Sequence, residues 1–219
     1  WKHPTRGLVS PGDFIPVAER SGLIVPLGSW VLREACTQLA RWRADLGPAA
    51  IRSINVNVAA RQLRDAEFVE EVSGVLRDNG LSPANLVIEV TESLVLDGRQ
   101  VRETLQALHE MGVRLALDDF GTGQSSLSLL RAFPVDVLKL DKSFVDGISE
   151  GADRGRLAVA AAVAQLAEHL QLSAVAEGIE TEAQMDRLRE MGYRLGQGFH
   201  LARPLPADEV AGLMTFVTA

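Results

Sequence analysis

The fold is decided by the stretch Val113-Arg-Leu-Ala-Leu-Asp-Asp-Phe-Gly-Thr-Gly123. Four of its first five residues are apolar, two carboxylates follow, and a glycine-containing turn ends it, which is typical of a buried strand running into a charged loop. Asp118 and Asp119 repel each other and resist dehydration, so they need a compensating positive charge, most simply a divalent metal ion. The same pattern also fits an acidic strand end that faces solvent, and this stretch alone leaves both interpretations open.

A short apolar strand, a polar residue at its carboxyl end and then a helix recur along the chain. We expect six such strands, which end near Asn57, Glu89, Asp118, Lys139, Glu177 and Gln197. Alternating strands and helices at this spacing predict parallel pairing with right-handed crossovers. Polar residues at every strand end favour a (β/α)8 TIM-like barrel, whose active site is assembled there. A doubly wound open sheet is the alternative, but it would gather its ligand residues at one switch point.

The predicted elements cover almost the whole chain. In order, we expect a loop over 1–12, a short helix over 13–19, a helix over 30–42, a strand over 51–58 with a polar turn around Arg61 and Gln62, helices over 66–78, 99–111, 125–133, 154–170, 182–191 and 205–217, and strands over 86–90, 113–118, 137–140, 173–176 and 194–197. A closed barrel of this kind has eight strands. We therefore expect a single domain over 1–219 that lacks the first two strands of its barrel, with those strands upstream of Trp1.

Composition excludes several classes of protein. The net charge of −7 disfavours binding to a DNA or RNA polymer through a basic surface, although a small anionic ligand held through metal ions remains compatible. Cys36 is the single cysteine, so no internal disulfide forms and a reducing, cytoplasmic compartment is expected. Its place between Leu32 and Leu39 in a helical pattern indicates a core residue. No apolar run reaches the roughly 18 residues that span a bilayer, so we expect no membrane insertion of this domain.

The strand ends suggest metal chemistry. If they converge, they bring together carboxylate and amide oxygens, which suit Mg²⁺ or Mn²⁺ better than zinc. The four histidines show no metal-binding spacing. Lys139 among the acids is either a structural counter-charge or a group that binds a phosphate and orients a water. We favour the second, because Lys139 lies at a strand end in register with the acids. Two hard cations with a lysine match phosphodiester hydrolysis.

Other catalytic motifs are incomplete. Asp119-Phe-Gly121 copies the metal-binding triplet of protein kinases, but no Gly-rich loop and no His-Arg-Asp precede it. Gly121-Thr-Gly123 lacks the third glycine of a dinucleotide-binding turn. No Gly-x-Ser-x-Gly occurs, which argues against a serine hydrolase.

The chain resembles the EAL-domain cyclic di-GMP phosphodiesterases over essentially its whole length. The resemblance is carried by eight motifs in order: Trp1-Lys-His-Pro4, Ser10-Pro-Gly-Asp-Phe-Ile-Pro-Val-Ala-Glu19, Val56-Asn-Val-Ala-Ala-Arg-Gln-Leu63, Ile88-Glu-Val-Thr-Glu-Ser93, Leu117-Asp-Asp-Phe-Gly-Thr-Gly123, Val135-Asp-Val-Leu-Lys-Leu-Asp-Lys-Ser-Phe144, Val175-Ala-Glu-Gly-Ile-Glu-Thr181 and Gln197-Gly-Phe-His-Leu-Ala-Arg-Pro-Leu-Pro206. It implies a barrel that hydrolyses cyclic di-GMP to linear pGpG at a two-metal site holding Mg²⁺ or Mn²⁺.

The resemblance also implies roles for single residues. The implied metal ligands are Asn57, Glu89, Asp118 and Asp119, with Asp119 bridging both ions. Lys139 would orient the attacking water, and Glu177 would either serve the second metal or act as base. Gln197 would contact the metal-water shell or the substrate, and Arg61 and Pro204 would contact the substrate.

Further residues are implied in supporting roles. Glu92 and Glu180 would support the metal ligands, and Asp141 would have the same role. Glu92 is also assigned to the catalytic group. The segment 120–126 resembles the loop that couples dimerisation to metal binding, which implies a homodimer.

Three departures from the family pattern are visible. The Glu-Ala-Leu triplet, with its metal-binding glutamate and a nearby phosphate-binding arginine, would lie just before Trp1. Gln124 stands where the family usually has Tyr, and Ala59 where it often has Ser. We expect the parent protein, which could carry a membrane anchor elsewhere, to be an enzyme and this chain alone to have little activity. The alternatives are a catalytically inactive cyclic di-GMP receptor and a purely structural dimerisation module.

Overall fold

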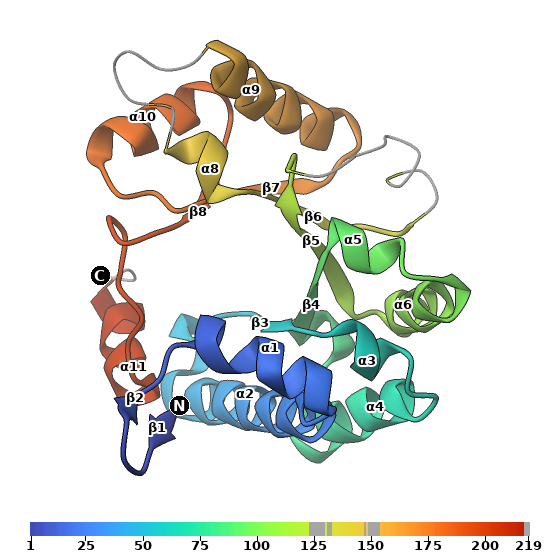
Figure 1. The fold of residues 1–219 in the computed structure, drawn as a ribbon. Helices are drawn as coiled ribbons and strands as arrows, with labels where there is room; N and C mark the ends of the chain where they lie inside the picture. The colour runs from blue at the N-terminus through green and yellow to red at the C-terminus, as the bar shows by residue number, and fades with distance from the viewer. Residues whose placement is uncertain (123–129, 131–132, 147, 149–153, 217–219) are drawn as a thin grey trace.

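Six parallel strands form one curled sheet in the computed structural model, which describes residues 1–122, 130, 133–146, 148 and 154–216. They pair in chain order, so that each strand lies beside the next one along the chain (Figure 1). The strands are β3 (Ile54–Asn57), β4 (Leu86–Thr91), β5 (Arg114–Phe120), β6 (Val137–Leu140), β7 (Ser173–Glu177) and β8 (Leu195–Gln197). The sheet is the half-barrel that the strand pattern predicts, and the TIM-like fold class is confirmed.

Helices connect the strands and cover the outer face of the sheet (Figure 1). The longer ones are α1 (Pro11–Ser21), α2 (Ile24–Leu46), α4 (Phe68–Asp78), α6 (Arg99–Met111), α9 (Arg154–His169), α10 (Glu182–Glu190) and α11 (Ala207–Phe216). Single helical turns follow several strands: α3 (Ala60–Leu63), α5 (Glu92–Val95) and α8 (Lys142–Val145), with 3₁₀ turns η1 (Gly47–Ala49) and η2 (Pro83–Asn85). None of the helices within the described ranges is both long and apolar enough to cross a membrane.

Alternation along the strands creates two separate apolar regions. Side chains that point outward, such as Ile88, Leu117 and Leu138, join the helices in the main core. Side chains that point inward form a small second cluster of Val87, Ala116, Val137 and the partly buried Val175. This inner cluster lies directly below the polar residues at the strand ends.

The helices bury the faces that their sequences predict. In α6 the buried positions Val101, Thr104, Leu105 and Leu108 recur at the spacing of one helical face. The helix ends at Gly112, whose φ of +101° places it in the left-handed region that glycine adopts without a steric penalty.

Several predicted boundaries are wrong for identifiable reasons. The predicted loop over 1–12 contains a two-stranded antiparallel hairpin, β1 (Lys2–His3) with β2 (Gly7–Leu8), too short to give a periodic signal. Helix α2 begins at Ile24 rather than Trp30, because a proline such as Pro26 is tolerated in a first turn. The polar turn around Arg61 is the helical turn α3. The predicted helix over 125–133 lies outside the described residues, apart from Leu130 and Phe133.

Candidate active site at the carboxyl ends of the strands

Four neighbouring strands place a charged side chain inside the half-barrel. Glu89 on β4, Asp118 on β5, Lys139 on β6 and Glu177 on β7 each lie two residues beyond a member of the inner apolar cluster. Since residues two positions apart point to the same face of a strand, these four side chains point inward, just above the inner apolar cluster. The structure thus brings together the residues at four of the six strand ends, whereas Asn57 and Gln197 are exposed.

Lys139 is the centre of the group. Its Nζ lies 2.8 Å from Glu89 Oε2, 3.1 Å from Asp118 Oδ1 and 2.6 Å from Glu177 Oε1. The side chains of Lys139 and Glu89 are only 5% and 6% exposed, so the ion pairs are made largely away from water. One ammonium faces three carboxylates, and the cluster keeps an excess of negative charge that favours cations.

Burial and neighbouring charges shift the protonation of this cluster. Burial alone would lower the pKa of Lys139, but its hydrogen bonds to Glu177 and Glu89 and the charges of Glu89 and Asp118 outweigh burial, so its pKa is raised. Lys139 is therefore an ammonium at neutral pH. Burial, with the charges of Asp118 and Glu89, raises the pKa of Glu177, although the hydrogen bond and charge of Lys139 oppose the shift. Glu177 is thus easier to protonate than an ordinary glutamate.

Asn55 is a member of the site that the sequence analysis missed. Its Nδ2 donates a hydrogen bond of 2.7 Å to Glu89 Oε1, while the other oxygen of Glu89 contacts Lys139. Asn57, the predicted ligand, is directly beside Glu89 in the strand register but is exposed. The alternation of β3 puts Asn55 and Asn57 on one face, and this signal could have found Asn55.

A β-bulge at Asp118 and Asp119 explains how two adjacent acids serve one site. Leu117 pairs with Leu138 and Phe120 with Leu140, so β5 has one residue more than β6 between these pairs. Asp119 takes a left-handed backbone conformation with φ of 55°, which is uncommon outside glycine and asparagine. Asp118 Oδ1 accepts a hydrogen bond of 3.0 Å from the Asp119 amide.

The bulge keeps Asp119 within electrostatic reach of the other acids. Burial has the largest effect on Asp119 and raises its pKa. The charges of Asp118 and Asp141 also raise this pKa, and the charge of Lys139 lowers it. Asp141 also begins α8, where its Oδ1 accepts a hydrogen bond of 3.0 Å from the Ser143 amide. It therefore contributes both negative charge near Asp119 and a helix cap.

Glu92 holds the start of the loop after β5. It is buried at the first position of α5, and its Oε1 accepts a hydrogen bond of 2.9 Å from the Gly121 amide. Gly121 has φ of +101°, and a Cβ there would lie 2.9 Å from the ring of Phe144. Of the predicted dimerisation segment 120–126, residues 123–126 lie outside the described part of the chain.

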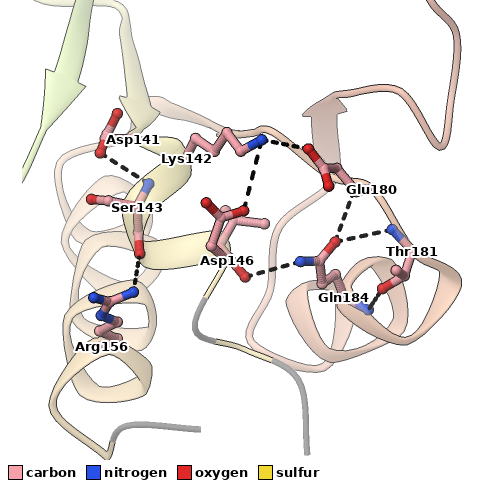
Figure 2. A network of polar contacts seen from close by, with 9 residues as sticks. Asp141, Lys142, Ser143, Asp146, Arg156, Glu180, Thr181 and Gln184 are labelled. Carbon is pink, nitrogen blue, oxygen red and sulfur yellow. Dashed lines mark hydrogen bonds and ion pairs between the residues drawn. The ribbon is translucent and has the colours of Figure 1, made fainter.

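The remaining predicted residues lie away from Lys139. Glu180 is exposed and pairs with Lys142 on the rim (Figure 2). Gln197 is exposed on β8, in register with Glu177. Arg61 is exposed, with its guanidinium packed against Gly22, and Pro204 is exposed beyond β8. No hydrogen bond or ion pair between described residues joins the side chains of Gln197, Arg61 and Pro204 to the central cluster.

The carboxylate oxygens at the strand ends are donors that a hard cation binds. In this structure, however, they are arranged around Lys139 as an ion-pair cluster. Across the described ranges, no three His, Cys, Asp or Glu side chains are grouped so that they could hold a metal ion. The Lys139 ammonium contacts one oxygen of each surrounding carboxylate. The Glu89, Asp118, Asp119 and Glu177 side chains nevertheless provide oxygen donors in negative excess, the combination that Mg²⁺ and Mn²⁺ prefer.

Comparison with proteins of related sequence gives close relatives. The chain is 42% identical over 211 residues to the bifunctional diguanylate cyclase/cyclic di-GMP phosphodiesterase MucR of Pseudomonas aeruginosa, covering 96% of this chain and 30% of that protein. It is 42% identical over 220 residues to the cyclic di-GMP phosphodiesterase NbdA of the same organism, covering 100% of this chain and 27% of that protein. The chain thus spans less than a third of the length of these relatives.

Solved structures share the fold at high similarity. The MucR phosphodiesterase in complex with cyclic di-GMP superposes with a TM-score of 0.89 at 43% identity, covering 96% of this chain and 84% of that one. Klebsiella pneumoniae BlrP1, solved with manganese and cyclic di-GMP, gives a TM-score of 0.68 at 34% identity, covering 78% of this chain and 43% of that one.

The family model agrees with both comparisons. It is the model of the EAL domain, and it matches residues 1–204, from the first hairpin to the segment beyond β8. With the strand order and the acidic strand ends described above, this match establishes that the chain belongs to the EAL domain family.

Proposed function

We propose that this chain is the hydrolase domain of a metal-dependent phosphodiesterase that converts cyclic di-GMP to linear pGpG. The observation that carries the proposal is Lys139, a buried ammonium within 3.1 Å of three carboxylates at the strand ends. Relatives named as cyclic di-GMP phosphodiesterases, at 42% identity, support the same substrate.

The proposed ligands for Mg²⁺ or Mn²⁺ are Glu89, Asp118, Asp119 and Asn57, with Glu177 as a further ligand. When bound, the cations supply an acidified water and offset the charge that develops on phosphorus. Asn55 holds Glu89 in place, because its Nδ2 engages the oxygen that does not face Lys139. BlrP1 with manganese supports the choice of metal.

Lys139 and Glu177 are the groups proposed to act on the nucleophile. Lys139, kept protonated by its surroundings, donates a hydrogen bond that orients the attacking water. Glu177 has a raised pKa and either accepts a proton from that water or binds the second cation. Gln197, Arg61 and Pro204 are exposed and are the proposed contacts of the dinucleotide.

The proposed assembly is a homodimer formed through the segment 120–126, and the proposed compartment is the cytoplasm. Glu92 contributes by fixing Gly121 at the start of this segment. A supporting role is proposed for Asp141 and Glu180 as well.

The test is hydrolysis of cyclic di-GMP with Mg²⁺ or Mn²⁺, followed by chromatography of pGpG. This chain is compared with a version extended upstream by further strands of its barrel. We expect pGpG from the extended version and little from this chain. An extended protein that binds the dinucleotide but never forms pGpG would establish the receptor alternative instead.

Asp119→Asn provides the matched variant in that assay. Asparagine accepts a left-handed backbone, so the fold is expected to persist. Losing a carboxylate that would hold the metal should lower the rate by about 100-fold or more. Asp186→Asn, at an exposed residue paired with Arg189, should leave the rate unchanged. Full turnover in Asp119→Asn would refute its metal role.

A further inference from the structure

The contact between Lys139 and Glu177 depends on how two neighbouring strands end. Lys139 lies on β6, which leads within three residues into α8, and Glu177 is the last residue of β7. The segment 178–181 then joins β7 to α10. The pairing of β6 with β7 holds these strands together up to Leu140 and Ala176. Glu177 lies just beyond the last pair, so its 2.6 Å contact with Lys139 Nζ also depends on how the segment 178–181 lies against α8.

Gln184 connects these two parts directly (Figure 2). Its Oε1 accepts hydrogen bonds from the Glu180 amide at 2.8 Å and the Thr181 amide at 3.0 Å. Its Nε2 donates to the Val145 carbonyl in α8 at 3.3 Å. The residue is 6% exposed, and a buried amide held at both ends is costly to disturb.

Lys142 also joins α8 to the segment 178–181. Its Nζ pairs with Glu180, and its methylene groups cover Gly178, where an added Cβ would lie 2.3 Å from Lys142 Cγ. The ion pair is about half exposed on each side and contributes little by itself. The buried amide of Gln184 is accordingly the stronger element of the connection.

Backbone hydrogen bonds fix the segment on the β8 side. The Ile179 amide donates to the Gln197 carbonyl at 3.1 Å, and the His200 amide donates to the Ile179 carbonyl at 3.0 Å. On the β6 side the connections come from the side chains of Gln184 and Lys142 instead. Of these two, only Gln184 is buried, so its loss is expected to change the distance between α8 and the end of β7 more.

We propose that Gln184 is a positioning residue for the hydrolysis, holding Glu177 against Lys139 by bonding α8 to the segment 178–181. This inference rests on the proposed function. Gln184 does not touch the reacting atoms and acts through Glu177. Because Gln184 lies on α10, the pattern of polar residues at the strand ends does not point to a role for it in the reaction.

Gln184→Glu separates positioning from helix capping. A glutamate keeps the acceptor oxygen for Glu180 and Thr181 and satisfies the capping box that Thr181 begins. It replaces the donor to the Val145 carbonyl by an oxygen, so only the connection to α8 is lost. Gln184→Ala loses both the acceptor for the Glu180 and Thr181 amides and the donor to the Val145 carbonyl. The control is Gln100→Glu, because Gln100 Nε2 also donates to a carbonyl of another segment, that of Arg64, at 2.7 Å.

The experiment measures kcat, KM and amide exchange of the segment 178–181 in the form that hydrolyses cyclic di-GMP. We expect Gln184→Glu to lower kcat by about 10-fold with little change in KM, since misplaced groups slow the chemical step more than binding. Amide exchange in 178–181 should rise, and the melting temperature should fall below that of Gln100→Glu, because Gln184 is buried and Gln100 is exposed.

Two outcomes would overturn the proposal. One is a kcat for Gln184→Glu equal to that of Gln100→Glu, and the other is unchanged exchange in 178–181. If no form hydrolyses cyclic di-GMP, the proposed function fails, and amide exchange alone then decides whether Gln184 holds the segment.

Discussion

Lys139 stabilises the site by its charge, because it is the cation that three poorly hydrated carboxylates face. The Glu89, Asp118 and Glu177 side chains are 6%, 15% and 19% exposed. Removing one partner of a buried ion pair leaves the others uncompensated. The stability of the metal-free protein should therefore depend on this lysine.

Lys139→Met should lower the free energy of unfolding by about 3 kcal/mol at pH 7. Without the ammonium, Glu177 loses the partner that lowers its pKa. The folded state then binds a proton more readily, and the loss should shrink toward pH 4. Urea unfolding at both pH values measures this difference. Lys142→Met, at an exposed lysine, should have a much smaller effect. An equal loss at both pH values would contradict this explanation.

Asn55 offers a test of how the Glu89 carboxylate is oriented. Asn55→Ala removes the hydrogen bond to Glu89 Oε1 without touching Lys139. We expect the affinity for Mn²⁺ to fall by about 10-fold, as for other residues that orient a ligand. Calorimetric titration of Mn²⁺ measures this affinity, with Asn79→Ala, at the residue that follows α4, as the control. An unchanged affinity would show that Glu89 is held by Lys139 alone.

At the scale of elements, the turn after β5 requires glycine at position 121. Gly121 combines a φ of +101° with a Cβ position 2.9 Å from Phe144, whereas Gly80 has φ of +62° and open space around it. Gly121→Ala should therefore destabilise the protein more than Gly80→Ala, by about 1–3 kcal/mol. Thermal melts of the two variants compare them. Equal melting temperatures would mean that Phe144 moves aside freely.

Helix α2 isolates Cys36 from solvent. Burial raises the pKa of its thiol from 9.0 to about 11, so the reactive thiolate is scarce in the folded protein. We expect no reaction with a thiol reagent at pH 8 until urea unfolds the chain. Since the folded pKa is the higher one, the thiol favours folding below pH 9, and this contribution is lost as pH rises toward 11. Fast labelling of the folded protein would contradict the burial.

The sequence predicts the strands better than the details of the site. Short apolar runs with a polar residue at the carboxyl end locate all six strands, because parallel strands covered by helices are mostly apolar. The bulge at Asp119 is not visible in the sequence, since it depends on how β5 pairs with β6. Asn55 was missed because Asn57 is nearer the strand end, although only Asn55 bonds Glu89. Gln184 contacts α8 through the fold, across 39 residues of sequence.

At the scale of the whole molecule, the half-barrel has two outer strands. Among the described strands, β3 pairs only with β4, and β8 only with β7. Unpaired strand edges leave backbone groups to be satisfied by other partners. The proposal that two upstream strands complete the barrel gives these edges their partners.

A version of the protein extended upstream by those strands should resist urea better than this chain. We expect a higher midpoint and a larger dependence on urea, because more surface is buried on folding. Its affinity for Mn²⁺ should also be higher. An unchanged midpoint would contradict the proposed completion of the barrel.

The left-handed backbone of Asp119 also bears on how such a domain can change over generations. Aspartate codons become asparagine or glycine codons by a single nucleotide substitution, and both residues accept a φ of 55°. A gene encoding this domain can thus lose the carboxylate at position 119, a proposed metal ligand, in one step while the backbone conformation is kept. Under the proposed function, the bulge offers a short mutational route from a phosphodiesterase to a protein that only binds its former substrate.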